Sequence, residues 1–346
     1  MVTSPSPRPA RVVVITGASS GIARATALAF AARGAHLVLA ARDAEALGQV
    51  AAECDRAGGK ALSVPTDVTD EAAVTGLARR AHDVFGGIDV WVNAAAVMAY
   101  GEFERVPADV YRHIIETNLF GQIHGARAAL PYFRERGAGV LVNVASVWGA
   151  VTSPYVSAYV TSKFGVRAFS DCLHEALRLE RATRDIHVCT ILPQSVDTPI
   201  FQHAANYTGH ESKPVPPVID PRRVVRAILR SVDHPRRRRT VGVWGRLIEI
   251  GHEFAPGLFG KAVPTVMNVA ALGQRGVADT TGNVVEPMSG WNQTDGHWRN
   301  TPLRIGVAVA GGVAAVGAGI GAGALWRGRR RAAVSRRGPF AAGGAG

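Results

Sequence analysis

Short apolar runs alternate with alanine-rich stretches from Arg11 to about Val243. Brief β-branched runs between turn residues are typical of buried strands, whereas apolar positions three or four apart are typical of helices. The pattern predicts strands near residues 11–16, 36–40, 61–65, 88–93, 139–145, 186–191 and 239–243. It predicts helices near residues 21–33, 43–57, 70–85, 107–117, 119–136, 157–182 and 221–232. Because strands and helices alternate, we expect an α/β fold, a doubly wound parallel sheet with a C-terminal extension.

Three segments fall outside this alternation. Residues 1–10 hold several prolines and serines, and we expect a disordered leader there. Residues 199–220 also carry prolines and follow a late strand, where loops of such sheets commonly cover the ligand, so we expect a mobile lid. Residues 244–304 are rich in Gly, Pro and Trp and are expected to form an irregular extension. The main domain is therefore expected to span residues 11–243.

The positive charge of the chain is concentrated in two segments. Hydrophobic residues make up 47% of the sequence, enough for a sizeable core, and the net charge is +12. Residues 221–239 hold eight arginines and one acid, Asp233, while residues 327–337 hold six arginines and no acid. The rest of the chain is close to neutral and shows no basic stripe interleaved with aromatic residues, the pattern typical of nucleic-acid binding. We therefore expect no nucleic-acid partner.

The cysteines give no indication of a metal site or a disulfide framework. Cys54, Cys172 and Cys189 are widely spaced, and none belongs to a CxxC pair or a Cys/His ligand pattern. Their spacing is typical of a protein from a reducing compartment. We expect no bound metal.

A glycine-bearing turn follows the first predicted strand. The sequence Thr-Gly-Ala-Ser-Ser-Gly-Ile-Ala occupies residues 16–23 and leads into a helix. Gly17 and Gly21 would let the backbone turn tightly and approach a pyrophosphate at the N-terminus of that helix. The same loop would bring Ser19, Ser20 and Ile22 next to a dinucleotide. The alternative is an ordinary tight turn.

Residues at the ends of the following strands would contact the rest of a dinucleotide. Arg42 lies just beyond the second strand, where an arginine pairs with the 2′-phosphate of NADP and an acid would instead bind the ribose of NAD. Arg42 therefore favours NADP(H), with NAD(H) as the alternative; Arg42 would otherwise be a solvated residue before the helix cap Asp43. Asp67, with its neighbour Val68, would face the adenine, and Asn93 would tie neighbouring strand ends together or simply form a turn.

Tyr159 and Lys163 form the pair with the clearest chemistry. They are four residues apart, so on a helix their Cβ atoms share one face about 6 Å apart. A tyrosine pKa near 10 makes a poor base at neutral pH, but an adjacent ammonium stabilises the phenolate. Ser146 follows the fifth strand and would donate a hydrogen bond to a substrate oxygen. Taken by itself, a Tyr-x3-Lys pair is usually an exposed pair of helical neighbours.

The ordered set of motifs resembles the short-chain dehydrogenase/reductase family. It comprises TGASSGIA (16–23), NAAA (93–96), Asn118, VNVAS (142–146) and the Tyr159/Lys163 pair, over residues 11 to about 243. The resemblance implies a Rossmann fold and an oxidoreductase that moves a hydride between NADP(H) and a carbonyl or secondary alcohol, with Tyr159 as general acid/base. A hydrophobic alcohol or ketone is the expected substrate, and residues 199–220 are the expected substrate lid.

The same resemblance implies roles for further residues. Asn118 would hold a water that links the lysine to solvent, and Lys163 would also bind the nicotinamide ribose. Val196 and Thr198 would lie against the nicotinamide carboxamide. Ala23, Ala96 and Gln194 depart from the family pattern, in which glycines are usual.

Family members commonly form homo-oligomers, so a homo-oligomer is expected here by resemblance. The competing hypothesis is a cofactor-binding Rossmann module without turnover, with a regulatory or membrane-organising role.

An uncharged segment of 22 residues, 305–326, precedes a basic tail at 327–346. It is long enough to cross a bilayer, but it contains seven glycines and has little transfer energy per residue. Two alternatives are open: membrane contact through this segment, or a tail that is flexible or packed on protein. The expected location is the cytoplasm, with membrane association as a possibility.

Overall fold

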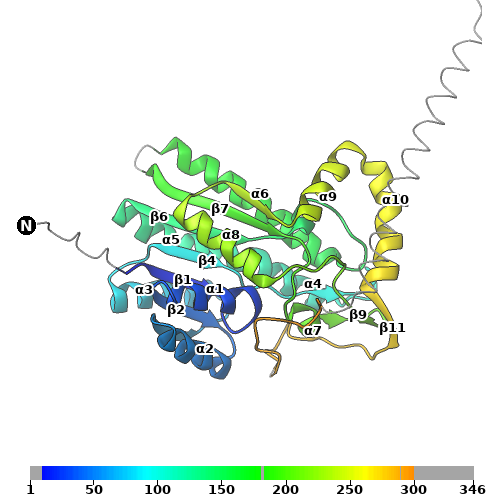
Figure 1. The fold of residues 1–346 in the computed structure, drawn as a ribbon, viewed down its shortest axis with the longest axis horizontal. Helices are drawn as coiled ribbons and strands as arrows, with labels where there is room; N and C mark the ends of the chain where they lie inside the picture. The colour runs from blue at the N-terminus through cyan, green and yellow to red at the C-terminus, as the bar shows by residue number, and fades with distance from the viewer. Residues whose placement is uncertain (1–9, 181–182, 289, 300–346) are drawn as a thin grey trace, which may run out of the picture.

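The computed structural model describes residues 10–180, 183–288 and 290–299 (Figure 1). The main strands are β1 (Val12–Thr16), β2 (His36–Ala41), β3 (Lys60–Pro65), β4 (Val90–Asn93), β6 (Ala138–Val144), β7 (Asp185–Pro193) and β10 (Arg238–Val241). The helices that connect them are α1 (Gly21–Ala31), α2 (Ala44–Arg56), α3 (Glu71–Phe85), α4 (Ala108–Ile115), α5 (Gly121–Arg136), α6 (Ser157–Leu179) and α8 (Pro221–Asp233). The predicted α/β alternation is confirmed.

In the described part of the chain, the central sheet has seven parallel strands in the order β10-β7-β6-β4-β1-β2-β3. The strand order reverses at β1, which pairs with β2 on one side and β4 on the other. This is the topology of a doubly wound Rossmann sheet, in which ligands bind beyond the carboxyl ends of the strands at the reversal. The predicted fold class is correct.

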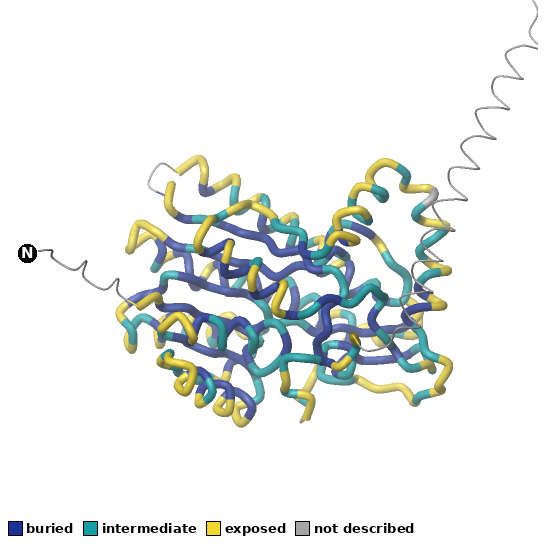
Figure 2. Tube along the Cα trace, in the orientation of Figure 1, coloured by how far each residue is buried: buried dark blue, intermediate teal, exposed yellow. Residues whose placement is uncertain are grey.

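Hydrophobic cores cover both faces of the sheet. Alternate residues of a strand point to opposite faces, and β1 follows this rule: Val13 and Ile15 pack with α1, α2 and α8, whereas Val14 packs with α3 and α5. The sheet is accordingly buried along most of its length (Figure 2). Such a rigid scaffold fixes the loops at its carboxyl edge.

The fourth and fifth helices form one continuous rod rather than the two separate helices predicted. A π-helical turn, Glu116–Phe120, joins α4 to α5 without a break. Single π turns within helices occur frequently at functional sites. Asn118, the residue of this rod that we expected to be functional, lies in this turn. The wider π turn therefore sets the direction of its side chain.

The region expected to be a mobile lid contains regular structure. It holds α7 (Ile200–His203), β8 (Ala205–Asn206) and β9 (His210–Ser212). β8 pairs with β5 (Ala99–Tyr100), which follows β4. This pairing ties residues 199–220 to the body of the sheet.

The expected irregular extension also differs from the structure. It contains α9 (Val243–Phe254), α10 (Pro256–Val266), a π turn at Met267–Ala271 and β11 (Leu272–Gly276), which pairs with β9. We call α9 and α10 the helical arm; Figure 1 shows the arm projecting beside the carboxyl edge of the sheet. Residues 277–299 contain no helix or strand in their described part, and we call them the strap.

The predicted segments 305–326 and 327–346, and nearly all of the leader, lie outside the described residues. Within the described residues, no helix is long and apolar enough to span a bilayer.

Candidate active site

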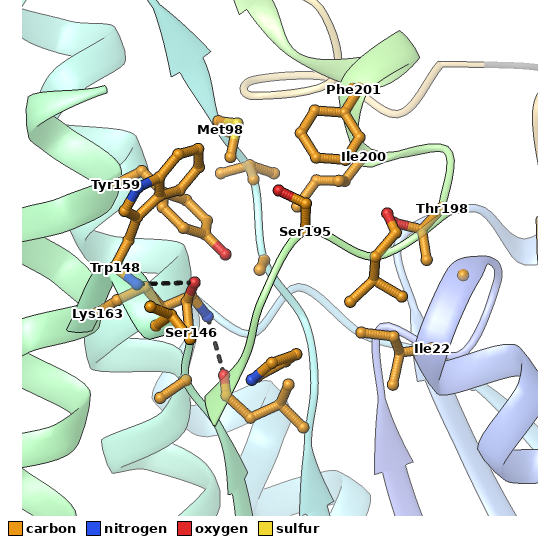
Figure 3. A pocket seen from close by; sticks show the side chains of 18 of the residues that line it. Ile22, Met98, Ser146, Trp148, Tyr159, Lys163, Ser195, Thr198, Ile200 and Phe201 are labelled. Carbon is orange, nitrogen blue, oxygen red and sulfur yellow. Dashed lines mark hydrogen bonds between the residues drawn. The ribbon is translucent and has the colours of Figure 1, made fainter. Parts of the chain in front are cut away.

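A cavity of about 610 Å³ opens at the carboxyl ends of β1, β4 and β6. The loops that follow these strands contribute Gly17, Ala94 and Ser146 to its wall. One part of the cavity lies beside the N-terminus of α1. The other part lies beside Tyr159 (Figure 3), and residues of the helical arm also line the cavity.

The loop between β1 and α1 is shaped for close approach of a phosphate. Gly17 and Gly21 have φ of +72° and +55°, in the left-handed region that favours glycine. A Cβ added at Gly17 would lie 2.7 Å from the Cα of Ala95, so no side chain fits there. The first turn of α1 holds no acidic residue, and Ser20 makes no side-chain cap. The loop therefore fits the pyrophosphate of a dinucleotide, and all five predicted loop residues line the cavity: Gly17, Ser19, Ser20, Gly21 and Ile22.

Ser146, Tyr159 and Lys163 come together on the cavity wall (Figure 3). Lys163 is 1% exposed; its Nζ donates to the carbonyl of Val144 at 2.9 Å and lies 5.4 Å from the centroid of the Tyr159 ring. The Ser146 hydroxyl oxygen accepts from the backbone N–H of Trp148 at 3.2 Å. The indole of Trp148 packs edge-on against the Tyr159 ring, with centroids 6.0 Å apart.

Burial is the main cause of the pKa shifts of Tyr159 and Lys163. It raises the pKa of Tyr159 above its usual value, and a hydrogen bond with Ser146 opposes that shift only in part. Burial also lowers the pKa of Lys163 to about 7. At neutral pH burial therefore favours the protonated Tyr159 phenol.

Two predicted asparagines lie behind the cavity wall. Asn118 is fully buried; its Oδ1 accepts from the backbone N–H of Val97, and its Nδ2 donates to the Val97 carbonyl and the Ser162 hydroxyl. Asn93 donates to the Asn143 side chain at 2.9 Å and so ties β4 to β6. Asn93 is fully buried, and this hydrogen bond is the strand-end tie that we expected of it.

Arg42, Asp67 and Val68 line the part of the cavity next to the carboxyl ends of β2 and β3. Asp67 accepts hydrogen bonds from the backbone N–H and hydroxyl of Thr69. Arg42 is engaged differently from the prediction: its guanidinium donates to three backbone carbonyls of the strap, those of Asn283, Val284 and Val285, at 2.5, 3.2 and 2.7 Å.

The strap also reaches the phosphate loop. The carbonyl of Gln293 accepts from the backbone N–H of Gly21 at 2.9 Å, and Arg24 donates to the carbonyl of Asn292. Figure 1 shows the strap returning from β11 past α7 toward α1. A segment about 270 positions later in the sequence thus lies over the loop.

Comparison with known proteins decides the family. A family model described as short chain dehydrogenase matches residues 11–207. The chain belongs to the short chain dehydrogenase family. The family binds NAD(P) and carries out oxidoreduction, so this short chain dehydrogenase is an oxidoreductase with a nicotinamide cofactor.

Several oxidoreductases are similar to this chain in sequence. An uncharacterized oxidoreductase, YxnA, from Bacillus subtilis is 34% identical over 259 residues, which cover 74% of this chain and 72% of the relative. Dehydrogenase/reductase SDR family member 7B from Bos taurus is 38% identical over 204 residues, 57% of this chain and 62% of the relative.

Solved structures share the fold. A short chain dehydrogenase/reductase from Burkholderia phymatum in complex with NAD has a TM-score of 0.63 at 27% identity, covering 71% of this chain and 95% of that chain. An alcohol dehydrogenase from Thermococcus sibiricus complexed with 5-hydroxy-NADP has a TM-score of 0.56 at 28% identity, covering 67% of this chain and 95% of that chain.

The remaining predicted residues of this short chain dehydrogenase lie in the loop after β7. Val196 and Thr198 line the cavity, and Val196 forms a backbone bridge with Ile219. Gln194, one of the departures from the family pattern, donates to the Pro217 carbonyl at 2.7 Å and accepts from the N–H of Gly245 at 3.3 Å. It therefore fastens the start of the helical arm to the lid region.

Ala23 and Ala96 are accommodated in different ways. Ala23 is buried within the core beneath α1, where one methyl fits. Ala96 lies on the cavity wall.

Sequence reasoning missed two parts of the site in this dehydrogenase. His203 is buried, lines the cavity, and has its pKa lowered by burial. The arm residues Trp244, Leu247, Ile248 and Gly251 also line the cavity. Their spacing of three and four is the helical period, which would have identified an apolar helix face.

Proposed function

We propose that the chain transfers a hydride between NADP(H) and a carbonyl or secondary alcohol, with Tyr159 as general acid/base. The observation that carries the proposal is the convergence of Ser146, Tyr159 and Lys163 on the same cavity as the glycine loop. In reduction, the hydride donor and the proton donor would then meet at the same carbonyl group. NADPH oxidation in the presence of a panel of ketones and aldehydes tests the proposal; cofactor binding without turnover across the panel would favour a regulatory module instead.

The side chains divide the work on the substrate oxygen. The bound nicotinamide supplies or accepts the hydride. The Ser146 hydroxyl donates a hydrogen bond to the substrate oxygen, which holds the carbonyl next to the Tyr159 phenol. That phenol gives its proton to the oxygen as negative charge develops there. The Lys163 ammonium beside the ring stabilises the phenolate that is left.

Arg42 is proposed to select NADP(H). It lies at the adenosine end of the cavity, where its guanidinium would exchange the strap carbonyls for a 2′-phosphate, a stronger partner because both groups are charged. We expect Arg42→Ala to weaken NADPH binding by about 10- to 100-fold, on the order of 1.5–3 kcal/mol, and NADH binding far less. Fluorescence titration of both cofactors measures this. Equal losses for the two cofactors would contradict the assignment.

The reduction rate should fall as the pH rises through about 7. Burial lowers the pKa of Lys163 to about 7, so above that pH the lysine loses the charge that stabilises the Tyr159 phenolate. The dependence of kcat/KM on pH, with NADPH saturating, measures the effect. A profile that is flat from pH 6 to 9 would contradict it.

The same pKa predicts how stability changes with pH. Between about 7 and the ordinary value of 10.5, the unfolded chain holds the Lys163 proton and the folded chain does not. Because the unfolded state then binds more protons, stability rises with pH in this window. The wild type should therefore gain stability relative to Lys163→Met between pH 7 and 10, as measured by urea unfolding.

A further inference from the structure

The helical arm forms an apolar wall of the cavity beyond Tyr159. Trp244, Leu247 and Ile248 of α9 and Phe259 and Val263 of α10 line it. All five side chains are uncharged and mainly hydrocarbon. A substrate that extends from the Tyr159 hydroxyl in this direction would therefore contact apolar atoms.

The opposite wall has the same character. This wall is formed by Trp148, Phe201 and Val215, and Met267 lines the cavity at the end of α10. The ionisable side chain on this wall is His203, whose pKa is lowered by burial, so that it is neutral at pH 7. The described lining of this part thus offers no charge to pair with a charged substrate.

A second cavity, with a mixed polar and apolar lining that includes His252, lies against α10. It has a volume of about 260 Å³ and shares Thr152, Ser153, Phe259 and Val263 with the main cavity. Pro256 and Pro264 of α10 also line it. The apolar wall of the main cavity runs along both α9 and α10, which favours a long group over a compact one.

We propose that the substrate is an uncharged ketone or secondary alcohol with an extended aliphatic chain, which lies along the helical arm while its oxygen contacts Tyr159 and Ser146. This inference rests on the proposed function. Burial of each methylene contributes enough transfer free energy for about a fourfold gain. The value of kcat/KM should therefore rise about three- to fourfold per methylene until the arm is filled.

A series of 2-alkanones from 2-butanone to 2-dodecanone, reduced with NADPH, tests the inference. Ala262→Trp adds an indole on the lining face of α10 and should remove most of the gain for the long ketones while leaving 2-butanone within about twofold. Ala262→Phe provides a smaller obstruction should the first variant fold poorly. The matched control is Lys261→Trp, since Lys261 is exposed on the other side of the same helix.

The outcomes separate this inference from the proposed function. A series without chain-length dependence, or an equal loss for short and long ketones in Ala262→Trp, would overturn the aliphatic site. The rise in melting temperature of the NADPH complex when the same ketones are added measures their binding without turnover. A larger shift with 2-dodecanone than with 2-butanone, lost in Ala262→Trp, supports the site even if no ketone is reduced.

A second inference comes from the strap. It holds the backbone N–H of Gly21 and the guanidinium of Arg42, the two groups expected to bind the phosphates of a dinucleotide. Its far end is anchored at Arg299, which pairs with Asp197 at 2.7 Å, Asp220 at 2.5 Å and Asp295 at 3.0 Å. The Asp197 carboxylate also accepts from the backbone N–H groups of Gly296 and Trp298.

We infer that the docked strap competes with the dinucleotide, so that cofactor binding requires the strap to leave the phosphate loop. This inference also rests on the proposed cofactor. A ligand that binds one of two states is weakened by the fraction of protein in the other state. Because the strap must open for either cofactor, its release should tighten NADPH and NADH by the same factor.

Arg299→Ala removes the anchor and should tighten both cofactors about tenfold in fluorescence titrations. Arg275→Ala, which removes an exposed charge from β11, is the control and should leave both affinities unchanged. Hydrogen exchange provides a second measurement: NADPH should accelerate exchange of the Gly296 and Trp298 amides in the wild type. Weaker or unchanged binding in Arg299→Ala, or added protection of those amides, would show that the strap is a wall of the site.

Discussion

Replacing Tyr159 by phenylalanine should lower kcat for carbonyl reduction by about a thousandfold or more and leave the Kd for NADPH within about twofold. The variant keeps the ring that packs against Trp148 and lies beside Lys163, so the buried wall keeps its shape. It removes the proton donor, a contribution of about 10²- to 10⁴-fold. Single-turnover NADPH oxidation and fluorescence titration measure the two quantities.

Tyr155→Phe is the matched control for that result. Tyr155 lies two residues before α6, its hydroxyl donates to Asn268 at 2.5 Å, and it is absent from the cavity lining. We expect its kcat within about threefold of the wild type. Substantial reduction activity in Tyr159→Phe would mean that another group donates the proton.

Gly125→Ala should lower the free energy of unfolding by about 2–4 kcal/mol. Gly125 lies in α5, and a Cβ there would be 2.6 Å from Nε1 of Trp91 and would collide with the Asn93 amide. It would disrupt a buried chain of hydrogen bonds from Trp91 to Asn93, to Asn143 and on to Ser170 of α6. Since α6 carries Tyr159 and Lys163, activity should fall as well. Urea unfolding measures the loss.

Gly48→Ala is the control with the opposite expected sign. Gly48 is inside α2, and a Cβ there meets nothing within 4 Å. Alanine reduces the conformational entropy lost on folding, so stability should increase by about 0.5–1 kcal/mol. A similar loss in both variants would contradict the packing argument for Gly125.

Acidic residues from another part of the chain pair with some of the arginines in segment 221–239. The arginine-rich segment 221–239 suggested a basic patch, yet Arg237 and Arg238 pair with Asp171, and Arg237 also reaches Glu175. The acids lie on α6, about 65 residues earlier in the chain. Their position beside β10 depends on how α6 packs, which the local sequence of 221–239 does not encode.

Local sequence was sufficient for the fold and for the common helix face of the two residues that we propose transfer the proton. The periods of 2 and 3.6 specify which segments are strands and helices, and the spacing of four between Tyr159 and Lys163 fixes their common face on α6. Gly17 and Gly21 were identifiable because a tight phosphate turn needs backbone conformations that glycine adopts most easily. These features depend on residues close together in the chain.

Tertiary structure decided what surrounds those residues. The contact of Gln293 with Gly21 and those of the strap with Arg42 join positions more than 240 residues apart, and no local pattern announces them. The protonation of Tyr159 and Lys163 likewise follows from burial by several distant elements, which outweighs the mutual influence of the pair. The sequence by itself determined the scaffold and the spacing of the proposed reacting groups, because both depend on short-range patterns. Packing of the helical arm and the strap decided the shape and charge of the cavity and the access to it.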